Sequence, residues 1–346
     1  MLEGLTLQSG WRVLSRLEEY PGKTGGCFSC PYIVEKDGRR AFLKALDYSQ
    51  AEDIASQLGS DIPTALQMLV AAYNFERNLL RDCAQKRMDR VVTALEDGSV
   101  QVGSGSYGVL GTVNYLIFEC ADGDVRRHLA LAEKIELAWK LRCIHNIATG
   151  LLQLHSAGVA HQDVKPSNVL VFGADGSKIA DLGSASRRGI VSPRDDLEFA
   201  GESTYAPPEL LYNYLDPEWN RRRQACDVYH LGSMVVFFFC GVGMTAMILK
   251  HLAPEHHPTR WAGTYTEVLA EVRNAFGASL REIGRNFEGQ HLQTTLRTAV
   301  SQLCDPDPLL RGHPQNRVGS TNRYSLERYV SLFDLLARRS EIGVLN

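Results

Sequence analysis

Four side chains within residues 163–181 have the types and spacing that a chemical reaction could use. Asp163, Lys165 and Asn168 occupy one short stretch, and Asp181 follows soon after it. A carboxylate can orient a hydroxyl group, and a lysine can direct a cation at a phosphate. Transfer of the γ-phosphoryl group of ATP needs mainly an oriented hydroxyl and neutralised phosphate oxygens, because its transition state is loose. The candidate catalytic residues of such a transfer are Asp163 and Lys165. The candidate metal ligands are Asn168 and Asp181, whose oxygen atoms suit Mg²⁺.

The residues between Asn168 and Asp181 predict the element that positions both. Apolar runs at 169–172 and 177–180 flank a Gly-Ala-Asp-Gly stretch at 173–176. Two short apolar runs separated by Gly and Asp are typical of a β-hairpin. A hairpin returns the chain to the end where it started. We therefore expect Asn168 and Asp181 to come together at that end.

The same stretch resembles the catalytic core of a known family. Residues 161–168 read His-Gln-Asp-Val-Lys-Pro-Ser-Asn, and residues 181–183 read Asp-Leu-Gly. They are similar to the H-R-D-x-K-x-x-N loop and the D-F-G motif of eukaryotic-type (Ser/Thr) protein kinases. Gln162 replaces the loop arginine and Leu182 replaces the phenylalanine. Neither change removes a metal ligand or the hydroxyl acceptor.

The resemblance implies an α+β, bilobal protein-kinase fold that uses ATP and Mg²⁺, with ATP in the cleft between the lobes. The small lobe, about residues 1–121, is expected to hold a twisted antiparallel sheet, one main helix and a glycine-rich loop. The helical large lobe, about residues 122–346, is expected to carry the catalytic loop and the activation segment. A chain of 346 residues is long enough for two such lobes with separate cores.

Lys44 and Glu76 resemble the family's ATP-phosphate lysine and its glutamate partner. Residues 39–46 alternate like a half-buried strand around Lys44, and residues 71–80 have apolar side chains at helical spacing around Glu76. The alternative is that Glu76 is a solvated helix charge. The 31 residues between Lys44 and Glu76 exceed what a compact kinase needs. An additional helical piece is therefore expected before or within the helix of Glu76.

Upstream of Lys44, residues 22–32 stand where the family places its glycine-rich loop. The candidate nucleotide-binding residues there are Gly25, Gly26 and Phe28, with Gly26 and Phe28 at the second-glycine and aromatic positions. The backbone N–H groups of small residues can cover phosphates. A plain turn between two strands would explain the same residues.

Residues 114–124 resemble the strand and hinge that hold adenine. Phe118 takes the position that guards the back of the adenine pocket. The backbone groups of Glu119 and Ala121 are expected to bond the adenine edge. An ordinary buried strand that ends in a turn is the alternative explanation.

Three further residues resemble the family's structural landmarks. Glu209 stands in the Pro-Glu pair that ends the activation segment, and Arg311 is similar to the distant arginine that pairs with this glutamate. We expect this buried pair to anchor the segment and to perform no chemistry. Asp227 begins what looks like the central helix of the large lobe. It is expected to tie the backbone of the catalytic loop from below.

The resemblance favours serine or threonine of a protein substrate, the chain itself included, as the phosphate acceptor. Lys165 supports this, because tyrosine-directed relatives usually lack that lysine. Glu202 is a departure, since Ser/Thr kinases generally place there a threonine that contacts the loop lysine; Ser203 or Thr204 are possible substitutes. The alternatives are a pseudokinase that acts as a nucleotide-binding scaffold and a kinase of small molecules. The Pro-Glu segment argues against small-molecule kinases.

Gln162 predicts an unusual mode of control. In most loop-regulated kinases the residue at this position is an arginine, which a phosphate on the activation segment neutralises. Gln162 carries no charge, so the kinase is expected to be active without phosphorylation of that segment. Arg187, Arg188 or the arginines at 221–223 are possible substitute anchors for such a phosphate.

The composition is that of a cytoplasmic enzyme. Charged residues make up 22% of the chain and the net charge is −3, which gives no indication of nucleic-acid binding. Residues 1–8 lack the basic and apolar regions of a signal peptide. The apolar stretch at 231–249 approaches the length of a membrane span, but Asp227 just before it favours a buried helix, so no membrane contact is expected. No pattern indicates an oligomeric state.

Overall fold

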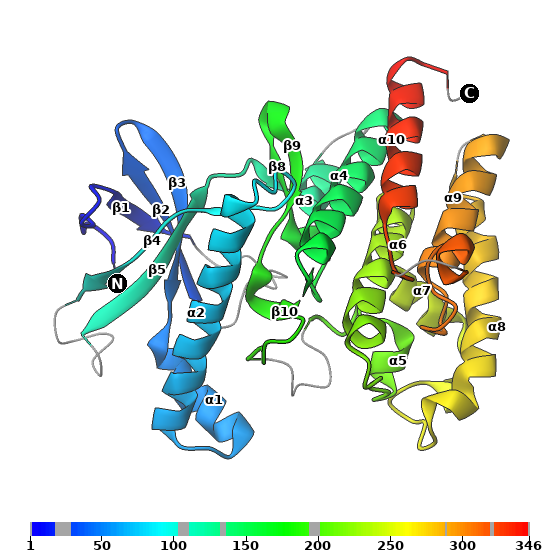
Figure 1. Cartoon of the computed structure of the whole chain (residues 1–346), viewed down its shortest axis with the longest axis horizontal. Helices are drawn as coiled ribbons and strands as arrows, with labels where there is room; N and C mark the ends of the chain where they lie inside the picture. The colour runs from blue at the N-terminus through cyan, green and yellow to red at the C-terminus, as the bar shows by residue number, and fades with distance from the viewer. Residues whose placement is uncertain are drawn as a thin grey trace. The chain divides into compact units, whose positions relative to one another are not determined.

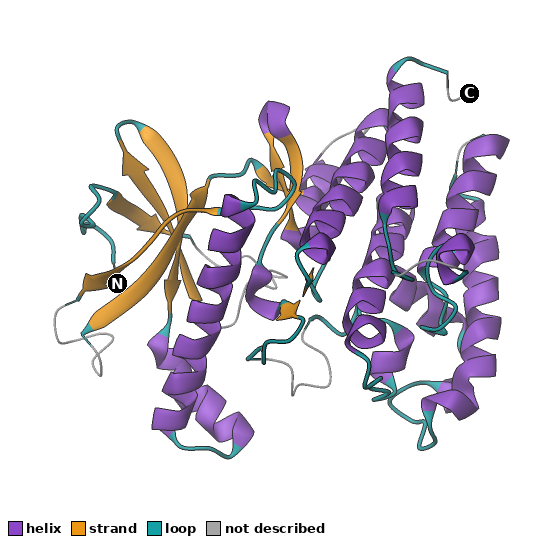
Figure 2. Ribbon diagram, in the orientation of Figure 1, coloured by secondary structure: helices purple, strands orange, loops and turns teal. Residues whose placement is uncertain are grey.

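The computed structural model describes residues 2–17, 29–102, 111–131, 136–193, 201–287, 289–318 and 322–344. Contacts within the chain divide it into two compact units. The first comprises Met1–Asp122 and Ala180–Gly183, and the second comprises Gly123–Ile179 and Ser184–Asn346. One unit is built on an antiparallel sheet and the other mainly on helices (Figure 1 and Figure 2). The predicted α+β class is thus confirmed. The lobe limits 1–121 and 122–346 stay a prediction.

The first unit contains a five-stranded antiparallel sheet with the order β1-β2-β3-β5-β4. Its strands are β1 (Arg12–Arg16), β2 (Ser29–Lys36), β3 (Arg39–Leu46), β4 (Ala94–Gln101) and β5 (Thr112–Glu119). In β3, Ala41, Leu43 and Ala45 are buried on one face of the sheet, as the alternating sequence predicts. The opposite face of the strand presents Phe42 and Lys44.

Two helices follow β3, which confirms the additional helical piece expected between Lys44 and Glu76. They are α1 (Ala51–Leu58) and α2 (Ile62–Gln85). Gly59 ends α1 with a φ of 61°, a left-handed conformation that glycine adopts at little cost. Asp61 then caps α2, because its side chain accepts a hydrogen bond from the backbone N–H of Thr64 at 2.8 Å.

A buried tyrosine fixes α2 against the sheet. The hydroxyl of this residue, Tyr73, donates a hydrogen bond to the backbone oxygen of Tyr115 on β5 at 3.0 Å. Leu69, Leu79 and Glu76 lie on the same buried side of α2. The spacing of these residues is that of one helical face. Glu76 therefore faces the sheet rather than solvent.

The second unit is mainly helical. Its helices are α3 (Val125–Leu131), α4 (Leu137–Ser156), α5 (Pro208–Leu211), α6 (Ala225–Cys240), α7 (Met244–His251), α8 (Tyr265–Gly284), α9 (Gln290–Leu303) and α10 (Glu327–Glu341). Helices α4 and α10 pack together, and Arg142 of α4 pairs with Asp334 of α10 at 2.9 Å. A π-helical turn, Asn220–Gln224, leads directly into α6.

The most apolar stretch of the sequence forms the centre of this unit. Helix α6 is buried from Ala225 to Phe238, which confirms the buried helix expected here. Gly241 ends α6 with a φ of 75°, and α7 begins three residues later. Within the described residues, no single helix has the length and apolar character to cross a membrane; only a pair bent by 80°, Asn220–Cys240 with Met244–His251, passes that test.

The hairpin expected after the catalytic loop is present. Strands β8 (Val169–Phe172) and β9 (Gly176–Ile179) pair antiparallel, with Val169 opposite Ile179 at the open end. Strand β6 (Gly123–Asp124) completes this small sheet on the other side of β8. A separate two-stranded ladder joins β7 (Val159–Ala160) to β10 (Ser186–Arg187).

Candidate active site

The catalytic loop of the second unit brings three of the predicted residues together. Asp163, Lys165 and Asn168 are all buried. The amide of Asn168 donates to the backbone oxygen of Asp163 at 2.8 Å and to its Oδ2 at 3.0 Å. The Nζ of Lys165 lies 3.0 Å from the same Oδ2. Lys165 precedes Pro166 and is fully extended, with φ −145° and ψ 167°, as a residue before proline tends to be.

Glu202 also belongs to this cluster. From the sequence alone it is only a departure from the threonine that Ser/Thr kinases place there. Its Oε2 lies 3.2 Å from the Nζ of Lys165, and its backbone N–H donates to Oδ1 of Asp163 at 3.1 Å. Glu202 itself therefore makes the contact that the family assigns to a threonine. The hydroxyl of Thr204 donates to Oε1 of Glu202 at 2.6 Å. Lys165 thus lies against two carboxylates.

Gly201 permits this close approach. A Cβ atom at this position would lie 2.6 Å from the backbone oxygen of Gln162 and 2.8 Å from Oδ1 of Asp163. Both distances are shorter than non-bonded contacts of real Cβ atoms, so any side chain would push the segment off the loop. Glycine at 201 therefore positions Glu202 beside Lys165.

Asp227 of α6 supports the loop from below, as predicted. It is fully buried and accepts hydrogen bonds from the backbone N–H groups of His161 at 2.7 Å and Gln162 at 2.8 Å. Its Oδ2 also lies 2.8 Å from Nε2 of His155. Burial alone would raise the pKa of Asp227, but its hydrogen bond and electrostatic interaction with His155 lower that pKa below its ordinary value. Asp227 is therefore held as a carboxylate.

Gln162 contacts an arginine that comes from a distant segment. Its amide donates to the backbone oxygen of Arg223 at 2.8 Å, and the Nη1 of Arg223 lies 3.3 Å from its Oε1. Arg223 is only 3% exposed. A guanidinium thus stands beside the loop where the loop's own arginine is missing. Arg223 is therefore a buried member of the set of possible phosphate anchors. Arg188, another member of that set, stacks on Trp219, with 5.0 Å between the guanidinium carbon and the ring centroid.

A second cluster lies in the first unit. The Nζ of Lys44 on β3 lies 2.9 and 3.1 Å from the two carboxylate oxygens of Glu76 on α2. The predicted ion pair is therefore present, and the solvated-charge alternative for Glu76 is wrong, since this side chain is 9% exposed. Asp181 lies on the other side, with Oδ1 3.1 Å from the same Nζ. Burial alone would lower the pKa of Lys44, but the carboxylates of Asp181 and Glu76 raise it above its ordinary value.

The backbone around Asp181 is specialised for this contact. Asp181 has a φ of 66°, which residues other than glycine seldom adopt. Its Oδ1 accepts a hydrogen bond from the N–H of Gly183 at 3.3 Å. A Cβ at Gly183 would lie 3.2 Å from that oxygen, so a larger residue there would displace the carboxylate. The Asp181 side chain is 31% exposed and reachable from solvent.

The remaining nucleotide-binding candidates have less support from the geometry. Glu119 is the last residue of β5 and pairs with Ala41, and Ala121 lies two residues beyond the strand. Phe118 packs near Phe42 with ring centroids 6.3 Å apart. The adenine role of Glu119 and Ala121 stays a prediction. Gly25, Gly26 and Phe28 lie outside the described residues.

The predicted anchor pair in the second unit is also present. Both Nη atoms of Arg311 donate to the carboxylate of Glu209, at 2.6 and 2.8 Å. Arg311 is fully buried and also donates to the backbone oxygen of Ala225 at 3.1 Å. Glu209 belongs to the short helix α5 that ends the activation segment. The pair therefore ties this helix to the loop before α10.

A family comparison agrees with this geometry. The model of the family described as "Protein kinase domain" matches residues 63–308, which is more than half of the chain. The chain belongs to the protein kinase domain family. Members of this family generally use ATP and Mg²⁺ and act on proteins.

Similarity to individual protein kinases is low. The chain is 26% identical over 225 residues to the hormonally up-regulated neu tumor-associated kinase of Mus musculus, covering 64% of this chain and 28% of that protein. It is 28% identical over 128 residues to an Aurora kinase of Debaryomyces hansenii, covering 37% of this chain and 30% of that kinase. It is 33% identical over 129 residues to serine/threonine-protein kinase PLK4 of Xenopus laevis, covering 37% of this chain and 13% of that kinase. The matched segment spans less than a third of these relatives.

Proposed function

We propose that the chain transfers the γ-phosphoryl group of ATP to serine or threonine hydroxyls of proteins, its own chain among them. The observation that carries the proposal is the loop cluster of Asp163, Lys165 and Asn168, held together by two hydrogen bonds and an ion pair of 2.8 to 3.0 Å. The name of one relative, serine/threonine-protein kinase PLK4, supports the choice of serine and threonine.

The residues fit the roles that this reaction requires. Asp163 orients the substrate hydroxyl and accepts its proton, while Lys165 directs its ammonium at the transferring phosphoryl group. Lys44, held by Glu76 at 2.9 Å, binds the ATP phosphates. Gly25, Gly26 and Phe28 cover the phosphates, and the backbone of Glu119 and Ala121 bonds adenine. In this assignment the small lobe, residues 1–121, supplies nucleotide contacts, and the large lobe, residues 122–346, supplies the catalytic loop.

Each of the two proposed ligands offers an oxygen atom that suits magnesium. Asn168 donates its amide nitrogen to Asp163, which leaves its carbonyl oxygen as a neutral hard donor, and Asp181 supplies a partly exposed carboxylate. When bound, the cation neutralises charge on the phosphate oxygens. Asp181→Asn is expected to weaken the Mg²⁺-dependent part of ATP binding, because an amide is a poorer ligand for Mg²⁺ than a carboxylate. Titration with a fluorescent ATP analogue over a range of Mg²⁺ concentrations measures this directly. Equal affinity in both proteins at every concentration would remove Asp181 from the metal site.

The decisive experiment is incubation of the purified chain with labelled Mg-ATP, with and without a generic basic protein and a panel of small hydroxyl compounds. Label on serine or threonine of protein supports the proposal. Label only on small molecules would identify a small-molecule kinase, and nucleotide binding without any transfer would identify a pseudokinase. Asp163→Asn is the matched control, because it keeps the size of the side chain while removing the proton acceptor. It is expected to leave nucleotide affinity nearly intact and to lower kcat by a factor on the order of 10² or more.

A further inference from the structure

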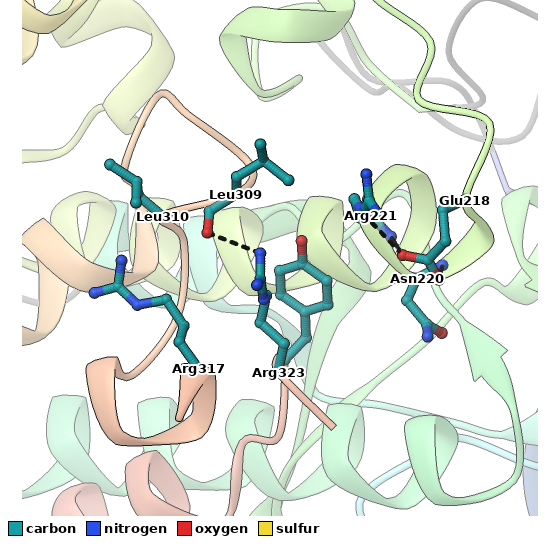
Figure 3. A pocket seen from close by; sticks show the side chains of 8 residues that line it. Glu218, Asn220, Arg221, Leu309, Leu310, Arg317 and Arg323 are labelled. Atoms are coloured by element: carbon teal, nitrogen blue, oxygen red, sulfur yellow. Dashed lines mark hydrogen bonds and ion pairs between the residues drawn. The ribbon is translucent and has the colours of Figure 1, made fainter. Parts of the chain in front are cut away.

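A cavity of about 670 Å³ lies in the second unit and is lined by none of the residues of the clusters described above. One wall comes from residues 218–221, just before and within the π-helical turn that leads into α6. The other wall comes from the loop between α9 and α10. Figure 3 shows the lining side chains, among which are Asn220, Arg221, Leu309, Leu310, Arg317 and Arg323. We call this cavity the arginine pocket.

The arginine pocket carries an excess of positive charge. Arg221 is compensated, because it lies 3.3 Å from Glu218 and 3.5 Å from Asp216. Arg317 and Arg323 differ from it. Within the part of the chain that the structure describes, neither has a carboxylate within 4.0 Å. Arg323 donates one N–H to the backbone oxygen of Leu309 at 3.0 Å, which leaves most of its five donors for another acceptor.

The pocket also has an apolar rim. Leu309 and Leu310 line the edge of the cavity, and 42% and 41% of their surfaces are exposed. Single exposed leucines are common on protein surfaces, but here two of them share one cavity with two guanidinium groups that have unused donors. Such a surface matches a ligand that has an anionic group next to an apolar one. A cavity of this size accommodates several residues of a peptide and is much larger than one phosphate ion.

Hydrogen bonds within the protein hold three of the lining residues. The side chain of Glu218 accepts hydrogen bonds from the backbone N–H groups of Asn220 at 3.0 Å and Arg221 at 3.3 Å. Tyr324 is 2% exposed, and its hydroxyl donates to the backbone oxygen of Pro308 at 2.9 Å. These contacts fix Asn220, Arg221 and Tyr324 before a ligand binds, which lowers the entropic cost of ordering them on association.

We propose that the arginine pocket binds a segment of a partner protein in which a phosphoserine or phosphothreonine adjoins a leucine-like residue. A phosphate dianion carries two negative charges, which balance the two positive charges of the uncompensated guanidinium groups in this cavity, and the planar fork of arginine matches phosphate oxygens in pairs. The leucine-like residue covers Leu309 and Leu310. Nucleic acid fits less well, because it presents a row of phosphates to two free cations on a chain with a net charge of −3. The proposal does not depend on the catalytic assignment.

Fluorescence polarisation with the full chain tests the proposal. The probe is a fluorescein-labelled peptide, Gly-Leu-phosphoserine-Leu-Gly, compared with the same peptide containing serine. The phosphopeptide is expected to bind at least tenfold more tightly. Inorganic phosphate is expected to compete only at concentrations at least tenfold higher than the unlabelled phosphopeptide requires.

Two variants locate the binding. Arg317→Glu reverses a charge in the pocket and is expected to weaken phosphopeptide binding tenfold or more. Arg339→Glu makes the same change at an exposed position of α10 and is expected to change affinity less than twofold. Thermal unfolding of both variants should match that of the unaltered chain. Equal affinity for the serine and phosphoserine peptides, equal losses in the two variants, equal competition by inorganic phosphate, or tighter binding of a short RNA than of the phosphopeptide would each overturn the proposal.

Discussion

Lys165 is the residue whose surroundings differ most from those that the family resemblance implies. Its ammonium lies 3.0 Å from Asp163 and 3.2 Å from Glu202, so one cation faces two carboxylates. Under the proposed function, Lys165 acts on the negative charge of the transferring phosphoryl group. The carboxylate of Glu202 opposes that action electrostatically, and the same carboxylate also holds the ammonium in place.

Glu202→Gln separates these two effects. The amide keeps an oxygen that can accept a hydrogen bond from Lys165, while the opposing charge is removed. We expect kcat on a serine peptide to rise about threefold or more, since a low-dielectric site amplifies the effect of one charge. Glu202→Ala removes the charge and the contact together and is expected to lower kcat below that of Glu202→Gln. Steady-state kinetics with both variants makes the comparison. A kcat for Glu202→Gln no higher than that of the unaltered chain would show that the charge of Glu202 does not restrain Lys165.

Among elements, α6 carries the most titratable groups in a buried setting. Asp227 and His230 are both nearly or fully buried on this helix. The pKa of His230 is lowered to about 4, mainly by burial; Asp227 opposes this shift, and the charges of Arg311 and Lys165 add to it. The Sγ of Cys226 lies 3.7 Å from Nε2 of the same ring. His230 is therefore neutral in the folded chain throughout the physiological range.

This lowered pKa makes stability depend on pH. An unfolded histidine has a pKa of about 6.5, so between pH 6.5 and 4 the unfolded chain binds a proton at His230 that the folded chain does not. Stability must fall as the pH falls through that window. Between pH 7 and 5 the free energy of unfolding is expected to drop by an amount on the order of 2 kcal/mol. The His230→Gln variant is expected to lack this drop. Urea unfolding at the two pH values measures it. The control is His291→Gln at an exposed position, in which stability should keep its full pH dependence. If the stability of His230→Gln kept the same pH dependence as the unaltered chain, His230 would not be the group responsible.

At the scale of elements, sequence patterns predicted the helices, strands and turns that local residue types determine. The alternation around Lys44, the helical spacing around Glu76 and the turn at 173–176 gave the strand, the helix and the hairpin that the structure contains. The pair Lys44 and Glu76 could be anticipated because the resemblance supplied the contact. The glycine-rich loop is different, because its predicted residues depart from the family pattern and lie outside the described residues.

At the scale of the whole chain, one buried pair joins segments 102 residues apart. Arg311 is fully buried and Glu209 is 4% exposed. Burial alone would lower the pKa of Arg311, but Glu209 raises it above its ordinary value, so Arg311 stays charged. Removing one partner leaves the other charge buried without compensation.

Arg311→Met is therefore expected to lower the free energy of unfolding by about 3 to 5 kcal/mol. The double variant Arg311→Met with Glu209→Leu replaces both charges by apolar groups and is expected to recover part of that loss. Urea unfolding of the two single variants and the double variant forms a double-mutant cycle. If the double variant lost as much as the sum of the single variants, the two charges would not be coupled.

The contacts that sequence reasoning missed are all long-range. Nothing local to Glu202 indicates that its carboxylate meets Lys165, because that contact depends on how closely Gly201 approaches the backbone of Gln162. The contact of Gln162 with Arg223 likewise joins residues 61 positions apart. A pattern read from one sequence carries spacing along the chain, and such pairs are set by packing in three dimensions. The resemblance could supply only the long-range pairs that relatives share, such as Glu209 with Arg311.

The fully buried carboxylate of Asp227 has a consequence for motion. It accepts the backbone N–H groups of His161 and Gln162, which lie in a loop without regular secondary structure. Exchange of these two hydrogens with deuterium from solvent requires their hydrogen bonds to the buried carboxylate to break. They should therefore exchange as slowly as amides in the middle of a buried helix. The loop that carries Asp163 would then rank among the slowest-opening parts of this unit.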